Sequence, residues 1–198
     1  MKKILVFILL FLRFIVGNAQ NDFQEKPYVL IIPEGWTTEQ FPIPIGFAPE
    51  IPYVGIEDIR FAPGWANPNS DEYWTYVFLW YLDGHHDIDE DIIERHLKSY
   101  YTGLIKVNSD NKQDKKMSSV NTSITQEKTS KNDLKTFSGS IEMDDYLSGK
   151  AITLHYLVHV KIYLDGNKTA LLFELSPKPF NDIQWKKLND IWNSFTCK

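Results

Sequence analysis

The sequence predicts an α+β fold in which an antiparallel sheet of five to seven strands packs against helices. Residues 73–82, Tyr-Trp-Thr-Tyr-Val-Phe-Leu-Trp-Tyr-Leu, have strand composition. They are mostly apolar at odd and even positions alike, so both faces of this strand should be covered. Later strand-like segments follow one another across short turns, which favours antiparallel pairing. Helical spacing ending near residue 106, and again at about 182–195, supplies the helices.

The N-terminus has the layout of a secretory signal peptide. Two lysines precede an apolar run, and small residues stand at the −3 and −1 positions of a cut before Gln20. A membrane anchor is disfavoured, because Arg13 interrupts a run already shorter than the roughly 20 residues that span a bilayer. We therefore expect removal of residues 1–19. The remaining residues 20–198 are then one exported domain, periplasmic or extracellular, without a membrane span.

The net charge excludes one class of partner, and the cysteine content excludes an intrachain disulfide. The chain has a formal net charge of −5, and loss of Lys2, Lys3 and Arg13 with the signal peptide takes it to −8. An acidic chain without a basic run lacks the electrostatic footprint of a nucleic-acid binder, so we exclude nucleic acid. The single cysteine, Cys197, cannot form an intrachain disulfide even in an oxidising compartment.

The first part of the chain places short strands among proline-rich turns. Residues 28–32 have strand composition and end at a Pro-Glu-Gly turn. Residues 41–53 contain four prolines, which remove donors from any strand ladder, while their apolar residues predict a strap lying over the core. Residues 55–61 are the next expected strand. Its neighbours Glu57 and Asp58 should point to opposite faces, so they cannot work as a carboxylate pair.

The second half begins with a helix whose first turn is acidic, which is favourable against the helix dipole. Residues 108–133 are polar and are expected to be partly mobile, with a short edge strand near 120–124. In the last helix Asn181 and Gln184 occupy capping-box positions. Between these segments the expected strands, the last two joined by an Asp-Gly hairpin signal, are 137–143, 152–164 and 170–175.

The aromatic strand at 74–82 is followed by a helix, and the chain ends with Leu-Leu-Phe-Glu-Leu at 171–175, Ser-Pro and a terminal helix carrying Trp185, Leu188, Ile191 and Phe195. Over residues 55–195 this order resembles the PsbP-type α/β/α sandwich, the fold of the extrinsic photosystem II protein and of a Ran-binding import factor. The proline-rich strap is not part of that pattern. The resemblance implies a binding or accessory module, although fold alone does not carry function.

Few residues form a pattern typical of a metal site or a catalytic site. His85, His86 and Asp87 are the best metal candidates, because imidazole and carboxylate ligands suit zinc. A solvated helix N-terminus has the same composition, so we assign no metal and no cofactor. His155 and His159 have the spacing of a helical metal pair, but on a strand about 13 Å would separate them, so we expect them to be polar residues on a face partly open to water. Because the chain also lacks a Gly-x-Ser-x-Gly elbow and a glycine-rich phosphate loop, we name no catalytic residue.

The aromatic content points to binding. Most of the six Trp, ten Tyr and twelve Phe must be core. A remnant around the strap, comprising Trp36, Phe47, Tyr53 and Trp65, is the predicted ligand-binding surface for a peptide, a glycan, an apolar ligand or a protein partner. Alternatively, the strap is only a structural lid. The sequence thus predicts an exported, non-catalytic binding or accessory module. The alternative left open is an exported hydrolase, metal-assisted through the two adjacent histidines.

Overall fold

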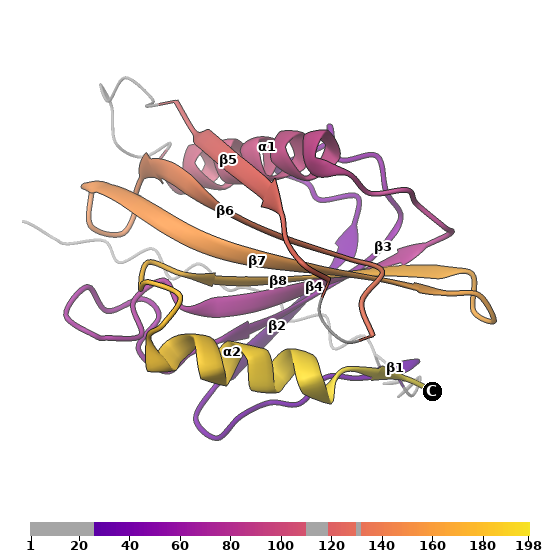
Figure 1. Ribbon diagram of the computed structural model, residues 1–198. Helices are drawn as coiled ribbons and strands as arrows, with labels where there is room; N and C mark the ends of the chain where they lie inside the picture. The colour runs from indigo at the N-terminus through magenta and orange to yellow at the C-terminus, as the bar shows by residue number, and fades with distance from the viewer. Residues whose placement is uncertain (1–25, 110–118, 130–131) are drawn as a thin grey trace, which may run out of the picture.

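The computed structural model describes residues 26–109, 119–129 and 132–198, in which a seven-stranded sheet lies between two helices (Figure 1). The predicted signal peptide, residues 1–19, lies outside the described residues. So do positions 110–118 and 130–131 of the polar segment. The strands, in sheet order, are β2 (Thr37–Ile43), β3 (Gly55–Phe61), β4 (Tyr76–Asp83), β8 (Lys168–Ser176), β7 (Ala151–Tyr163), β6 (Lys135–Asp144) and β5 (Asn121–Gln126).

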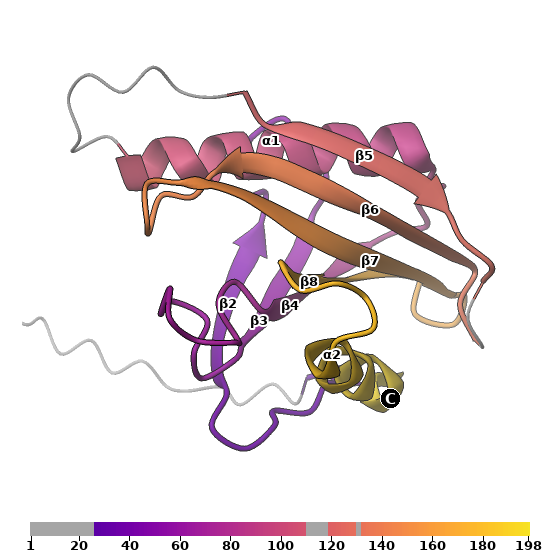
Figure 2. The same cartoon turned by 60° about the vertical axis from the view of Figure 1, so that its left-hand side comes forward.

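All neighbouring strands in this sheet pair antiparallel, so the predicted α+β class and the antiparallel sheet are confirmed. Helix α1 (Glu90–Ser109) covers one face and α2 (Ile183–Ser194) covers the other, above and below the sheet in Figure 1. Turning the molecule by 60° keeps β5 beside α1, as Figure 2 shows.

Strand β4 lies between β3 and β8 and carries a hydrophobic core on each face. Its even-numbered residues Tyr76, Phe78, Trp80 and Leu82 belong to the cluster beneath α1. The odd-numbered residues belong to the cluster beneath α2, and they are Val77, Leu79 and Tyr81. The two-faced prediction for this strand is therefore confirmed.

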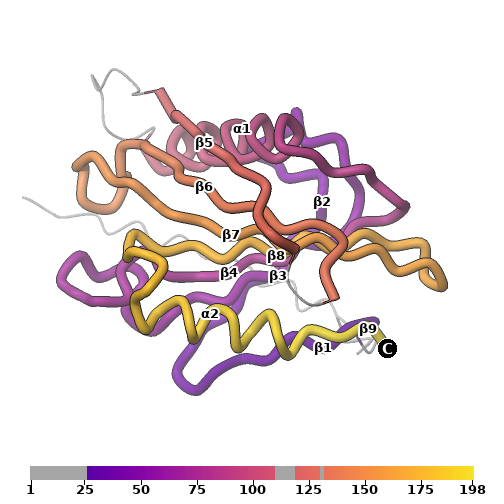
Figure 3. The backbone as a smooth tube through the Cα atoms, viewed as in Figure 1, coloured from indigo at the N-terminus to yellow at the C-terminus, as the bar shows by residue number. Residues whose placement is uncertain are grey.

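The N-terminal segment differs from its prediction. Only β1 (Tyr28–Val29) of the expected strand 28–32 forms, and it pairs with β9 (Thr196–Cys197) in a separate two-stranded sheet. Figure 3 shows these segments side by side at the C-terminal end of α2. The Phe195 backbone N–H bonds back to the Trp192 carbonyl at the end of α2, and the chain then leaves as a strand.

The strap, residues 41–53, differs from its prediction only at its start. Its first three residues complete β2, an edge strand that pairs with β3 through Ile43 opposite Gly55. Proline is tolerated there because an edge strand has one side without a ladder partner. The rest of the strap leaves the sheet and buries Ile45, Ala48 and Ile51 in the α1 cluster.

Two finer predictions were wrong. The N-cap of α2 is Asp182 rather than Asn181, and its carboxylate accepts from the Gln184 backbone N–H at 2.9 Å. His159 is buried rather than partly open to water. Its Nδ1 lies 2.7 Å from Asp133 and its ring stacks on Trp192 at 4.8 Å, because α2 covers this face of β7.

Candidate functional site

An aromatic cavity of about 210 Å³ lies between the sheet and the C-terminal half of α1. Strand register brings its floor together from residues far apart in the chain. Phe41 of β2 lies opposite Glu57 of β3. Phe61 of β3 lies opposite Tyr76 of β4. Residues opposite one another share a face of the sheet, and the complete floor is Glu39, Phe41, Glu57, Ile59, Phe61 and Tyr76.

The roof comes from α1 and the strap. One face of α1 lies over the cavity and carries three lining residues spaced four apart, which are Tyr100, Leu104 and Asn108. Phe47 of the strap packs edge-on against Tyr100 at a centroid distance of 5.0 Å. The strap reaches α1 at Gly103, where a Cβ atom would lie 1.8 Å from the Phe47 carbonyl oxygen. Glycine at that helical position therefore permits the contact that closes the roof.

Trp65, Trp74 and Tyr146 form the walls. Trp65 stacks on Phe61 of the floor at 4.4 Å and meets Trp74 edge-on at 6.4 Å. Tyr146, in the turn between β6 and β7, meets Trp74 edge-on at 5.3 Å. The rings thus hold one another in contacts typical of packed aromatic pairs, and these contacts define the shape of the cavity.

Asp145 fixes the wall. One carboxylate oxygen accepts from the Trp74 indole N–H at 3.0 Å, and the other accepts from the Tyr73 hydroxyl. The same carboxylate accepts from the backbone N–H groups of Leu147 and Ser148 in its own turn. Burial alone would raise the pKa of Asp145, but the hydrogen bonds, that of the Ser148 hydroxyl first among them, lower it. A charged clamp therefore joins the β6–β7 turn to the segment before β4.

The backbone at Trp74 is strained. Its φ of 51° lies in the left-handed region, which bulky residues seldom adopt. This geometry also explains why Tyr73 packs beside the α1 cluster although strict alternation predicts the other face. Strain of this kind persists where surrounding contacts hold it, and it is most frequent at functional sites.

Glu57 is the buried carboxyl group of the cavity, with only 1% of its surface exposed. Burial raises its pKa to about 7, against hydrogen bonds from Trp80 and Tyr100 that lower it, and the charge of Glu39 raises it further. The indole N–H of Trp80 donates to Glu57 Oε1 at 3.2 Å. Glu57 therefore titrates near neutral pH, next to a second carboxylate at the exposed rim.

The structure brings together two of the four predicted ligand-binding residues. Phe47 and Trp65 both line the cavity. Tyr53 is buried nearby but outside the lining, where its hydroxyl lies 3.1 Å from His96 Nε2. Trp36 belongs to the cluster beneath α2, on the opposite side of the sheet.

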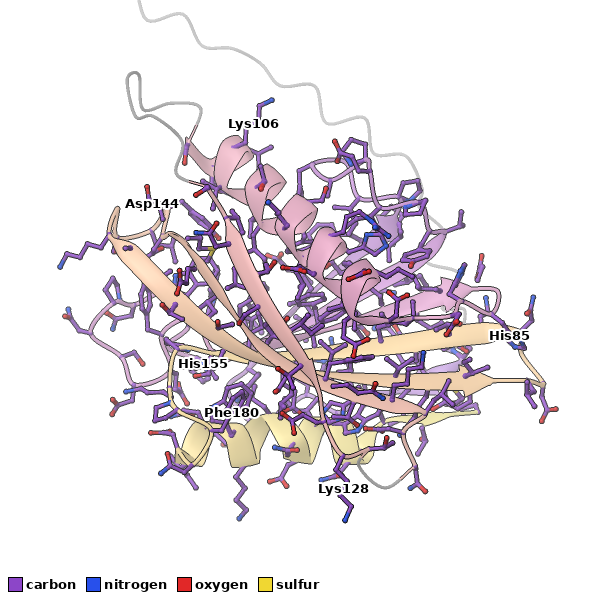
Figure 4. All side chains as sticks on the ribbon, turned by 45° about the horizontal axis from the view of Figure 1, so that its top comes forward. His85, Lys106, Lys128, Asp144, His155 and Phe180 are labelled. Carbon is purple, nitrogen blue, oxygen red and sulfur yellow. The ribbon has the colours of Figure 1, made fainter. Side chains whose placement is uncertain are left out.

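The three metal candidates do not converge. His86 Nε2 lies 2.8 Å from the Asp83 carbonyl oxygen, His85 Nε2 lies 3.4 Å from the Tyr163 carbonyl oxygen, and Asp87 pairs with Lys135. Figure 4 shows His85 far from Lys106 and Asp144, which mark the end of the molecule that holds the cavity. Across the described ranges, no group of three or more His, Cys, Asp and Glu side chains is placed to hold a metal ion.

Sequence reasoning missed Glu39, Glu57, Tyr100 and Tyr146 as parts of one site. A partial signal was present, because Glu57 is an acidic residue in a strand next to the most aromatic strand of the chain. What no local pattern supplies is the register of β2 on β3, or the approach of the β6–β7 turn to Trp74.

A scan against models of known protein families finds no match to this chain, and a search of curated proteins finds no significant match either. The resemblance to PsbP-type proteins therefore stays a prediction. In the described part of the chain, no helix has both the length and the apolar composition required to cross a membrane.

Proposed function

We propose that this protein is an exported, non-catalytic binding module that holds an apolar or aromatic group of its ligand in the cavity beneath α1. The observation that carries the proposal is a preformed hollow lined by rings from five separate segments. Its rim residues Phe41, Phe47 and Trp65 are exposed or half-buried. Partly exposed aromatic side chains around a concave site are typical of ligand pockets.

The lining chemistry favours binding over catalysis. Among the described residues of the lining there is no Ser, Cys, Thr, Lys or His, so hydroxyl, thiol and amine nucleophiles of these types and a histidine base are lacking. The volume of about 210 Å³ suits a chemical group rather than a whole drug-sized ligand. A group at the end of a peptide, glycan or lipid-like ligand fits this description.

A cavity-filling variant tests the proposal. Leu104→Trp should fill the hollow from the roof, whereas Val107→Trp adds the same bulk at a side chain that is 54% exposed. Ligand-observed NMR with p-cresol and indole should detect binding to the wild type and to Val107→Trp, and none to Leu104→Trp. Equal binding by all three proteins would place the apolar site elsewhere and overturn the proposal.

A second candidate function is an exported hydrolase, and the pair Glu39 and Glu57 is the observation that favours it. Glycoside hydrolases use two carboxyl groups whose pKa values are pushed apart, and the Glu57 pKa of about 7 fits the acid of such a pair. Binding remains the preferred proposal, because a general acid must reach the glycosidic oxygen and Glu57 is only 1% exposed, whereas its charge can act on a bound group without contact. Turnover of chromogenic aryl glycosides that is lost in both Glu39→Gln and Glu57→Gln would decide for the hydrolase.

Export rests on the N-terminal pattern of two lysines, an apolar run and small residues before Gln20. Expression of the full chain in a bacterial host with a secretory pathway should yield a protein whose intact mass begins at Gln20. A mature protein that keeps residues 1–19 would contradict export by this route.

A further inference from the structure

We propose that the cavity beneath α1 is a site for an organic cation, namely a methylated ammonium group, with Glu57 and Glu39 as its counter-charges. This inference rests on the proposed function, because it names the ligand class of the same cavity. It follows from three features of the described lining, which are its aromatic rings, its negative charge and its size.

The aromatic rings supply the first feature. Phe61 and Trp65 stack at 4.4 Å, and Phe47, Tyr100 and Tyr146 complete a ring-lined enclosure. Aromatic faces attract cations through the ring quadrupole, most strongly in sites that exclude water. Quaternary ammonium groups are bound in this way by enclosures of several rings, which a neutral apolar ligand does not require.

The charge of the lining is the second feature. Glu39 and Glu57 face one cavity, and no described residue of the lining is cationic. The cations of α1, which are Arg95, Lys98 and Lys106, line a neighbouring groove that shares Phe47 with the cavity, and none of them lines the cavity itself. A cationic ligand would therefore meet negative charge at both the rim and the buried end.

Asp58 provides an internal comparison for Glu57, because the two residues are adjacent on β3 and are equally buried. Asp58 is paired with Arg60 and with Lys26, whose Nζ lies 2.9 Å from Asp58 Oδ2. The described ion pairs include none to Glu57, which receives hydrogen bonds from neutral donors instead. A buried carboxylate of this kind is costly unless a cation joins it, and a ligand can supply that cation.

Size is the third feature. An engineered apolar cavity of about 150 Å³ holds benzene, and this one has about 210 Å³. A trimethylammonium group is comparable in bulk to benzene and fills such a space without presenting N–H donors. Besides the two carboxylates, the lining holds the Asn108 amide and three tyrosine hydroxyls, of which that of Tyr76 bonds to Tyr101 and that of Tyr100 to Glu57. Its surface is therefore mainly aromatic, which favours a methylated ammonium over a protonated amine.

Binding of a cation should depend on pH in a defined direction. With the pKa of Glu57 at about 7, a cation favours the ionised carboxylate, so binding releases a proton and weakens as the pH falls below 7. The titratable groups that face Glu57 from the elements around it are Glu39 of β2, Tyr76 of β4, Tyr100 and Tyr101 of α1, and Tyr146 of the β6–β7 turn. Burial raises the pKa of all four tyrosines away from neutrality, so Glu57, with its pKa of about 7, carries the expected pH dependence.

The decisive comparison uses choline and its neutral isostere 3,3-dimethylbutan-1-ol. Isothermal titration of the wild type at pH 8 should give at least about tenfold tighter binding of choline, the discrimination expected of a desolvated cation site. Glu57→Gln keeps the shape of the side chain and should remove that preference. Glu142→Gln, at an exposed position on β6, is the matched control and should retain it. In the wild type, the choline affinity should fall several-fold between pH 8 and pH 5.5.

The outcomes separate the two proposals. Equal affinity for choline and the isostere overturns the cation inference and leaves the apolar binding site intact. Failure of choline, the isostere, p-cresol and indole alike overturns the proposed function of the cavity as well. If Glu57→Gln does not fold, the isostere comparison and the pH profile of the wild type still decide, and a preference independent of pH contradicts the role of Glu57.

Discussion

Glu57 and Asp58 are neighbours on β3 whose carboxyl groups enter opposite layers of the molecule. The pKa of Glu57 is raised and that of Asp58 is lowered. Burial would raise the pKa of Asp58, but hydrogen bonds and charge from Arg60 and Lys26 outweigh it and lower that pKa. None of the ion pairs among the described residues involves Glu57, and burial raises its pKa to about 7. The difference arises from position alone, because alternation sends one side chain toward Arg60 and the other toward the aromatic cavity.

Replacing Glu57 by glutamine should therefore change how stability depends on pH. The folded state raises the pKa of Glu57 from 4.5 to about 7, so it holds the proton more tightly than the unfolded chain does. As the pH rises from 4.5 to 7, ionisation lowers the free energy of unfolding of the wild type by up to about 3 kcal/mol. Glu57→Gln cannot ionise and lacks this loss. Above pH 7 the difference between the two proteins should be constant.

Urea unfolding of both proteins between pH 4 and pH 8.5 measures this effect. The difference between the two free energies matters rather than either curve, because other carboxylates such as Asp58 titrate in the opposite sense and cancel in it. Two curves that stay parallel over the whole range would show that Glu57 is not destabilised by burial.

At the scale of the elements, the sequence best predicts the position of a strand or helix whose own composition determines which of its faces are buried. The strand ending at Leu82 is apolar on both faces, so its central position followed from composition. Strands β1 and β9 have two residues each and gain their pairing only from the packing of the two chain segments. Edge strand β2 contains Pro42. Because proline is rare in paired strands, the sequence pattern predicts a strap at this position rather than a strand of the sheet.

The candidate site was harder to predict than the fold. Phe47 and Trp65, which line one cavity, could be grouped from the sequence because both are aromatic residues close to prolines. Trp36 was grouped with them by proximity in the chain, but the residues before β2 cross to the α2 side of the sheet. The buried charge of Glu57 and the contact of Tyr146 with Trp74 depend on register and on tertiary packing. Neither has a signature in a single segment.

The strap gives a prediction at the same scale. Tyr53→Ser should lower the free energy of unfolding by about 3 kcal/mol, because Tyr53 is 7% exposed and its hydroxyl pairs with His96. Phe47→Ser removes a half-buried ring at the cavity roof and should cost about 1 kcal/mol. The same substitution should abolish binding of p-cresol. Thermal melts and ligand-observed NMR distinguish the two roles, and a large loss of stability in both variants would make the strap a structural cover only.

At the scale of the whole molecule, one sheet separates two layers of different character. The α1 layer contains the larger apolar cluster and the cavity. Charged and polar groups are buried in the α2 layer, including Arg60 with Asp58 and His159 between Asp133 and Glu174. Strands β4 and β8 pair at the centre and contribute side chains to both layers. A substitution that destabilises β4 should therefore reduce protection from hydrogen exchange on both sides of the sheet.

Trp80→Ala tests this coupling. Trp80 is fully buried in β4, contacts Phe173 of β8 at a centroid distance of 4.9 Å, and donates to Glu57. Truncation of a large aromatic side chain in a packed core costs about 3–5 kcal/mol, and we expect a loss in that range by urea unfolding. Because β4 and β8 belong to both layers, hydrogen exchange should accelerate in α2 as well as in α1.

The control Val107→Ala, at an exposed position of α1, should change stability by less than about 0.5 kcal/mol. If α2 kept its wild-type exchange rates while α1 lost protection, the two layers would unfold independently, and the central role of β4 would be contradicted.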